Sequence, residues 1–127
     1  MGIKVSVKDD KNKTEKWIKE IEGINYKNFL KKYGDKGVKA LSNATPKDTG
    51  KTASSWRYEI VKEGHNKYRL VFINDNVIND WANVAILIQY GHATKSGGWV
   101  EGIDYINPAL DPIFNELSKE IDKELKK

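Results

Sequence analysis

The sequence contains no cysteine and only two histidines. The lack of cysteine excludes disulfides and thiolate metal sites, which fits a chain made in a reducing cytoplasm. The longest apolar run, at residues 84–88, is far too short to span a bilayer, so we expect no membrane partner. The first residues carry no apolar segment of the secretory type, so we expect no secretion signal.

The residues that could catalyse a reaction or bind a metal do not occur at the spacings of known catalytic or metal-binding motifs. Only two histidines exist: His65 falls in an expected hairpin loop, and His92 lies at the end of an element. Histidines in such places cap or pack more often than they catalyse. Asp75 and Asp80 lack the glycine and glutamate of a calcium loop, and residues 97–99 lack the lysine or serine of a phosphate loop. We therefore expect no enzyme, metal, cofactor or small-molecule substrate.

The length of 127 residues predicts a single domain over residues 1–127. The 39% hydrophobic content predicts a modest core that a partner completes. The net charge of +4 is unevenly distributed, with 17 basic and 9 acidic residues in 1–69 but 5 basic and 9 acidic in 70–127. Such halves can attract each other in head-to-tail assembly, although unevenly placed solvated lysines are the simpler explanation.

Residues 45–58 join a helical N-terminal third to a β-rich middle. Pro46 stops a helix that arrives from the N-terminal side, and Gly50 allows the positive φ of a turn. Beyond the turn, Trp56, Tyr58 and Ile60 alternate with polar residues, which predicts a strand with one buried face.

Before this joint, alternation over residues 3–7 predicts a strand at a sheet edge. Thr14 can cap a brief helix that carries Trp17 and Ile18. A period near 3.6 then predicts a long helix over residues 25–43, in which Gly34 and Gly37 mark a kink or a close crossing against the sheet. The opposite face of that helix is rich in lysine, which we interpret as a solvated surface.

After the joint, strands at residues 55–63 and 68–74 form a hairpin. Residues 81–90 are apolar nearly all round, and periodicity does not separate helix from strand there, although length, two alanines and Gly91 favour a helix capped by Asp80. A loop at 92–98, a strand at 99–106 broken at Gly102, and a last helix opening at Asn107-Pro108 follow. The fold class is thus α+β: an antiparallel sheet of about four strands, with the long N-terminal helix and the C-terminal helix packed on one face.

The aromatic residues allow two interpretations. Trp56, Tyr58, Tyr68 and Phe72 would lie across two paired strands, where they form either a stacking platform for single-stranded nucleic acid or the core under the helices. The core is favoured, because two amphipathic helices need a sheet to cover. Trp81 and Trp99 flank the segment around Gly91 and are candidate interface anchors.

Two segments resemble blocks of one family. The first block, Ala44-Thr45-Pro46 with Asp48-Thr49-Gly50 and Ser55-Trp56, resembles the Pro-x-x-Thr-Gly-x-Leu-x-x-Ser stretch of small siphophage neck and tail-completion proteins, often called minor tail components. The second block, Gln89-Tyr90-Gly91-His92-x-Thr94 followed by Gly97-Gly98-Trp99-Val100-x-Gly102, resembles that family's second block, and Ala109-Leu110 the start of its C-terminal helix. Thr52 stands where the family usually has Leu, and Gln89 where it has an acidic residue.

The resemblance implies a structural virion protein without a catalytic step, made in the bacterial host cytoplasm. Such proteins form rings, commonly hexamers, between the connector and the tail tube, and DNA passes through the lumen. Head–tail joining or tail completion is therefore the expected function, and a small basic nucleic-acid-binding protein is the alternative. The candidate assembly residues are Pro46, Thr49, Gly50, Ser55, Trp56, Tyr90, Gly91, His92, Thr94, Gly98, Trp99 and Gly102. We also expect the basic half of one subunit to face the acidic half of the next.

Overall fold

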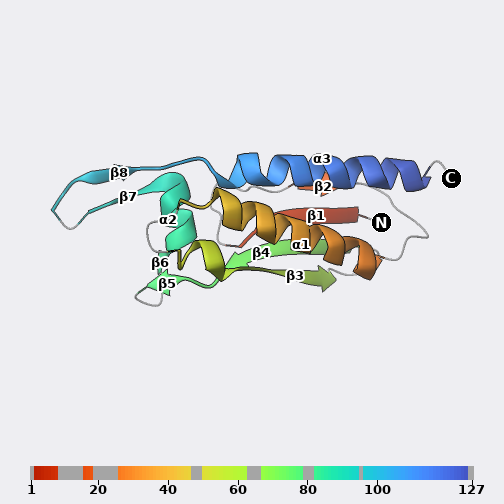
Figure 1. The fold of residues 1–127 in the computed structure, drawn as a ribbon, viewed down its shortest axis with the longest axis horizontal. Helices are drawn as coiled ribbons and strands as arrows, with labels where there is room; N and C mark the ends of the chain where they lie inside the picture. Colours follow the sequence, from red (N-terminus) through yellow and green to blue (C-terminus); the bar gives the residue numbers. More distant parts are fainter. Residues whose placement is uncertain are drawn as a thin grey trace.

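The computed structural model describes residues 2–8, 16–18, 26–46, 50–62, 67–78, 82–94 and 96–125. Three α-helices, a short 3-10 helix and eight strands lie within these residues, so the mixed α+β class is confirmed. Figure 1 shows an elongated arrangement, in which two long helices lie along the sheet and a thin hairpin projects at one end. Thr49, His65 and the hairpin tip at residues 64–66 lie outside the described residues.

The main sheet has four strands in the order β2-β1-β4-β3. Their bounds are Gly2–Val7 for β1, Lys16–Ile18 for β2, Trp56–Lys62 for β3 and Lys67–Asn74 for β4. β3 and β4 form the expected antiparallel hairpin, in which Trp56 lies opposite Asn74. β1 instead runs parallel to β4, so a purely antiparallel sheet is wrong.

Two expectations for the N-terminal segment are also wrong. β1 lies between β2 and β4, and not at an edge, so Val5, Ser6 and Val7 are all buried. Residues 16–18 pair with β1 as a strand and do not form a helix. Trp17 and Ile18 are residue types that strands favour, and pairing with β1 holds them in a strand, so the local helical pattern is overridden. Thr14 lies outside the described residues.

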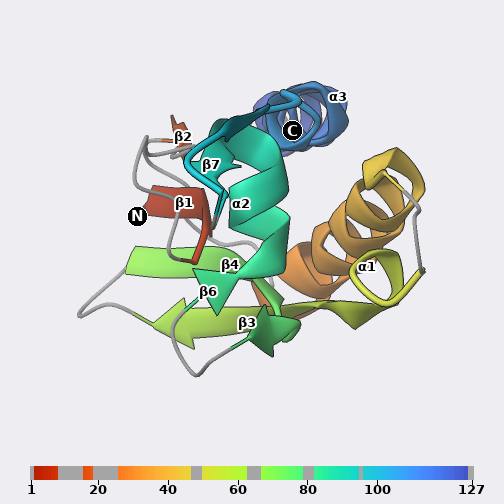
Figure 2. The same cartoon turned by 90° about the vertical axis from the view of Figure 1, so that its left-hand side faces the viewer.

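The two long helices form the layer above the sheet (Figures 1 and 2). α1 spans Tyr26–Ala44 and α3 spans Ile106–Leu125. An added Cβ at Gly37 would come within 2.2 Å of the Phe72 ring, and one at Gly34 within 2.5 Å of the Tyr58 ring. The two glycines therefore let α1 approach the sheet closely.

The core lies between this helical layer and the sheet. Phe72 is 0% exposed and Trp56 6%, so these aromatic rings pack under the helices and are not a stacking platform for nucleic acid. The largest fully buried side chains are Tyr33, Phe72, Leu30, Leu41, Leu70, Ile106, Leu117 and Ile121.

Basic and acidic side chains meet where α1 and α3 lie side by side. Lys32 pairs with Glu120 at 3.2 Å, and Lys36 pairs with Glu116 at 2.6 Å. The Tyr33 hydroxyl also donates a hydrogen bond to Glu120, which holds the pKa of that carboxyl below its ordinary value. Part of the charge asymmetry between the chain's halves is thus balanced within one subunit, and does not require a neighbouring copy. Exposed pairs of this kind contribute about 0–1 kcal/mol each.

The remaining elements gather at one end of the molecule. They are the 3-10 helix Ala53–Ser55, β5 Val77–Ile78, β6 Ala82–Asn83, α2 Val84–Tyr90, β7 Gly91–Ala93 and β8 Trp99–Glu101. The helix expected over 81–90 is shorter, because Asn83 caps it by accepting a hydrogen bond from the Ala85 N–H at 3.1 Å. Asp80 and Trp81 lie outside the described residues.

Three expectations for the second half of the chain differ from the structure. Part of the predicted loop at 92–98 is strand β7, and the strand predicted over 99–106 ends at Glu101. Asn107 does not cap the last helix, because α3 already begins at Ile106.

Among the described residues, no helix combines the length and the apolar character that crossing a membrane requires.

Candidate assembly surface

The first block forms a buried corner between α1 and β3. The Trp56 indole Nε1 donates to the Thr45 hydroxyl at 2.9 Å, and that hydroxyl donates to the Leu41 carbonyl at 2.6 Å. Pro46 is half-buried directly after this contact. The Thr45 hydroxyl therefore ties the end of the helix to the start of the strand.

The turn within the first block rests on Gly50, which has a φ of 76°. The Ser54 N–H donates to the Gly50 carbonyl at 3.0 Å, and the Ser55 hydroxyl donates to the Lys51 carbonyl at 2.6 Å. Gly50 and Ser55 thus have roles inside the subunit. The position of Thr49 is not described.

Thr52 accepts two hydrogen bonds from asparagine side chains. Its carbonyl accepts a hydrogen bond from the Asn74 side chain at 2.8 Å, and its hydroxyl accepts one from the Asn76 side chain at 2.9 Å. The Asn83 amide in turn donates to the Asn74 carbonyl at 2.9 Å. Thr52, Asn74 and Asn76 are all buried, so this hydrogen-bond network lies in the interior.

The second block begins with a buried glutamine that holds the start of α3. The Gln89 side-chain oxygen accepts hydrogen bonds from the N–H groups of Tyr105 at 3.0 Å and Ile106 at 2.9 Å. Its nitrogen donates to Asp104 at 2.7 Å. These bonds satisfy N–H groups at the helix start that otherwise lack partners, which explains why α3 begins before Asn107.

Gly91 and Gly102 of the second block face one another. Gly91 has a φ of 82°, and a Cβ there would lie 2.5 Å from the Val100 carbonyl oxygen and 2.8 Å from the Gly102 nitrogen. A Cβ at Gly102 would lie 2.5 Å from the backbone carbonyl oxygen of Gln89. Only glycine at both positions allows the two chain segments to lie this close.

The two blocks meet through Tyr105, which lies outside both. Its hydroxyl donates to the Ala85 carbonyl at 2.7 Å. Burial raises the pKa of Tyr105, and the nearby Thr45 hydroxyl opposes that shift. Thr45 therefore lies beside both Trp56 of the first block and Tyr105. The N–H of Tyr105 in turn donates to Gln89 of the second block. Two segments distant in the sequence become one structural unit.

β7, β8 and the residues up to Ile103 form a hairpin, called the arm below, that projects from the body (Figure 1). Thr94 closes it: its N–H donates to the Gly98 carbonyl at 2.9 Å, and its hydroxyl accepts from the Gly98 N–H at 2.9 Å. His92 lies opposite Val100, and its Nδ1 is buried without a hydrogen bond in the described part of the chain. Tyr90 is half-buried at the base of the arm.

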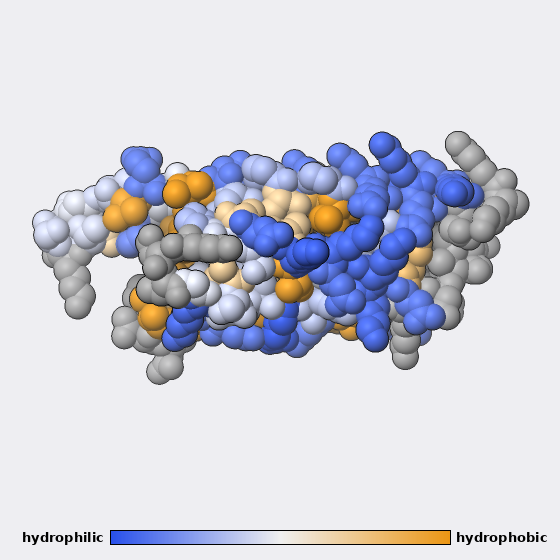
Figure 3. All heavy atoms as spheres, in the orientation of Figure 1, coloured by the Kyte–Doolittle hydropathy of each residue, from blue (hydrophilic) through white to orange (hydrophobic). Residues whose placement is uncertain are grey.

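Trp99 is the motif residue whose side chain is least used inside the subunit. It is 59% exposed, although one edge of its ring touches Gly91. Val100 and Ile103 in the arm and Val77 and Ile78 in β5 are also large, apolar and exposed. Figure 3 shows such apolar side chains at the end that carries the arm. This clustering marks a candidate protein-binding end.

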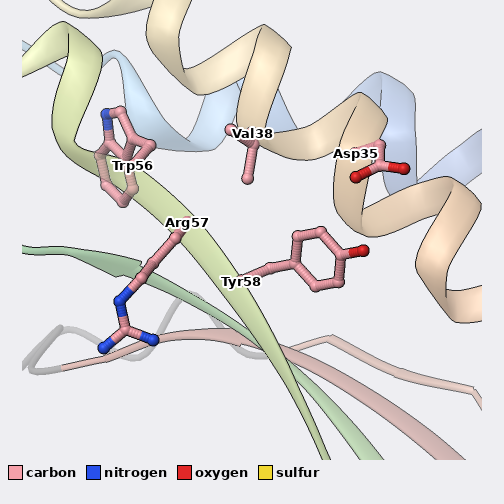
Figure 4. A pocket seen from close by; sticks show the side chains of 5 residues that line it. All are labelled: Asp35, Val38, Trp56, Arg57 and Tyr58. Carbon is pink, nitrogen blue, oxygen red and sulfur yellow. The ribbon is translucent and has the colours of Figure 1, made fainter.

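A cleft of about 290 Å³ opens between α1 and β3. It is lined by Asp35, Val38, Trp56, Arg57 and Tyr58. Figure 4 shows that Val38 and Tyr58 point into the space between helix and strand, whereas the Arg57 side chain points away from the helix. Arg57 is held there by Asp75 at 2.8 Å and Glu59 at 2.7 Å. Burial and the neighbouring Asp35 raise the pKa of Tyr58.

The sequence identified the motif residues, but it did not show which of them are used inside the subunit and which are exposed. Trp56 is buried, Gly50, Gly91 and Gly102 set the path of the backbone, and Trp99 is exposed. The exposed Val77, Ile78 and Ile103 were missed, because isolated apolar residues in short segments carry no sequence pattern.

Among the described residues, no cluster of histidines and carboxylates has the geometry of a metal site.

Comparison with family models, with curated proteins and with solved structures gave no match for this chain.

Proposed function

We propose that this protein is a structural component of a bacteriophage virion, acting in head–tail joining or tail completion. In this role it assembles as a ring, in the neck or at the tail end, and contacts the connector and tail-tube proteins. It has no catalytic step, cofactor or small-molecule substrate. Its scaffold is a four-stranded sheet with the N-terminal and C-terminal helices on one face.

The observation that carries the proposal is the joining of the two motif blocks. Thr45 of the first block binds Trp56 at 2.9 Å, and Gln89 of the second block binds the N–H of Tyr105 at 3.0 Å. Tyr105 lies close enough to Thr45 for the Thr45 hydroxyl to affect the pKa of Tyr105. The order and spacing that resemble the neck and tail-completion family thus correspond to contacts, and the arm with exposed Trp99 starts from this unit.

The alternative, a small basic nucleic-acid-binding protein, receives less support. Lys32 and Lys36 of the basic helix are paired with carboxylates of α3, at 3.2 and 2.6 Å. Phe72, one of the aromatic residues needed for base stacking, is 0% exposed. Retention on heparin that falls steeply with added salt would favour the alternative.

The virion role is tested by analysing particles from the bacterial host that encodes the chain. Purified, DNA-filled particles are expected to contain the protein in a fixed, small number of copies. Deleting its gene should leave filled heads and tails that do not join, or tails that stay incomplete. Particles that lack the protein and remain infectious without its gene would contradict the proposal.

A further inference from the structure

The arm and the cleft are two different surfaces of one chain. The arm carries apolar side chains that the subunit does not cover, with Trp99 59% exposed. The cleft between α1 and β3 is lined by Val38, Trp56 and Tyr58 together with the charged Asp35 and Arg57. Figures 1 and 4 place the arm beyond one end of the body and the cleft along its side, between α1 and β3. The arm therefore points away from the cleft of its own subunit.

The two faces of the arm differ in character. In β8, Trp99 and Glu101 share one face, because side chains alternate along a strand. Across the hairpin they lie opposite Ala93 and Gly91, the two smallest residues available. This face is thus flat apart from one indole and one carboxylate, which suits insertion of the indole into a recess.

The cleft offers matching chemistry. Val38, Trp56 and Tyr58 form the apolar part of its lining, and Asp35 and Arg57 form the charged part. Its volume of about 290 Å³ accepts one bulky side chain. Lys31 lies one helical turn before Asp35 on the same side of α1, and it is exposed without an ion pair among the described residues. Glu101 of the arm is likewise exposed and without an ion pair in the described ranges. Lys31, on the helix next to the cleft, therefore has the charge that complements Glu101, and both surfaces also carry apolar side chains.

We propose that the arm of one copy docks in the α1–β3 cleft of a second copy, with Trp99 in the cleft and Glu101 beside Lys31. A contact between two different patches is heterologous, so repeating it produces a ring when the rotation closes. This proposal rests on the proposed ring assembly and names the contact that would build it. Large aromatic residues commonly dominate such interfaces.

The absence of cysteine allows a direct test, because introduced thiols are the only ones present. Glu101→Cys and Lys31→Cys variants are purified separately, mixed and oxidised mildly. The expected product is a disulfide-linked heterodimer of the two variants. Lys123→Cys, an exposed site near the end of α3, replaces Lys31→Cys as the control and should not link to Glu101→Cys.

Two results would overturn the proposal. Preferential linking of Glu101→Cys to itself would mean that arms meet one another symmetrically. Absence of any link, with a monomer at every concentration, would mean that the arm docks on a different protein. Trp99→Ala should raise the dissociation constant of self-association at least about tenfold. Thermal unfolding of the monomer, measured at concentrations too low for association, should be unchanged because the side chain is exposed.

A charge exchange gives an independent readout. Glu101→Lys and Lys31→Glu should each weaken self-association, and the double exchange should restore it within about twofold. Loss in both single variants without recovery in the double variant would contradict direct pairing.

Rings that form normally without arm-to-cleft links would overturn this contact while leaving the virion role intact. Links in a protein absent from phage particles would support the contact and contradict the virion role.

Discussion

The indole nitrogen of Trp56 lies 2.9 Å from the hydroxyl of Thr45, to which it donates a hydrogen bond. These residues end α1 and begin β3, on either side of the turn through Gly50. The same hydroxyl donates to the Leu41 carbonyl at 2.6 Å and lies near Tyr105, just before α3. One threonine oxygen therefore connects the end of α1 to the start of β3.

Thr45→Val should destabilise the protein. Valine keeps the shape but removes the hydroxyl, so the buried Trp56 N–H loses its acceptor, at a cost of about 1–3 kcal/mol. Thr45→Ser, which keeps the oxygen, is the matched control and should cost less. Urea unfolding followed by far-ultraviolet circular dichroism measures both variants. Equal stability of wild type and Thr45→Val would contradict the role given to this oxygen.

Gly37→Ala should also destabilise the protein, although alanine is the better helix former by about 1 kcal/mol. The new methyl group would lie 2.2 Å from the Phe72 ring, and overpacking of this kind costs about 1–3 kcal/mol. Phe72→Leu in the same chain should recover part of that loss, because it removes the ring that is struck. A double-mutant cycle by thermal unfolding measures the coupling. Additive effects would show that the two residues do not touch.

Gln89→Leu should weaken the start of α3. It leaves the N–H groups of Tyr105 and Ile106 buried without an acceptor, which costs about 2–3 kcal/mol. Gln89→Glu keeps both acceptor interactions, although it places a carboxylate beside Asp104, and should cost less. Amide exchange at Tyr105 and Ile106 reports the change locally. Unchanged protection of these amides in Gln89→Leu would contradict the assignment.

Glu120 should make stability depend on pH. The hydrogen bond from Tyr33 lowers the pKa of Glu120 in the folded protein, so its stabilisation is fully present above the ordinary carboxyl pKa of about 4.3. It is lost as the pH falls through the lower folded value. The stability difference between wild type and Glu120→Gln should therefore be largest near pH 7 and vanish in acid. The side chain is 32% exposed, so the difference should be small and reduced by salt.

A constant difference between pH 7 and pH 3 would contradict that explanation. Glu116→Gln is the matched control, because Glu116 pairs with Lys36 and receives no hydrogen bond from Tyr33. Its effect should be smaller, because the contact is an exposed ion pair alone.

Elements with a strong local pattern were predicted well from the sequence. The long helix expected over 25–43 spans Tyr26–Ala44, and the hairpin of β3 and β4 has the expected partners. Both depend on neighbouring residues with a regular period, which the sequence displays directly. The role of Gly34 and Gly37 in a close crossing also followed, because glycine inside a helix needs a packing reason.

Features that depend on distant contacts were not predicted. β2 was mistaken for a helix, because its three residues are fixed by pairing with β1. The start of α3 was placed too late, because Gln89 holds it from 16 residues away. The same limit applies to the candidate surface: motif spacing identified Trp99 but not its exposure, and no pattern marked Val77 or Ile78.

The central claim is that this chain functions by binding copies of itself. Electron microscopy of the purified protein, with light scattering over a range of concentrations, tests it most directly. The account predicts closed rings of one size, which fall apart in Trp99→Ala. A monomer at every concentration, for both wild type and variant, would contradict it.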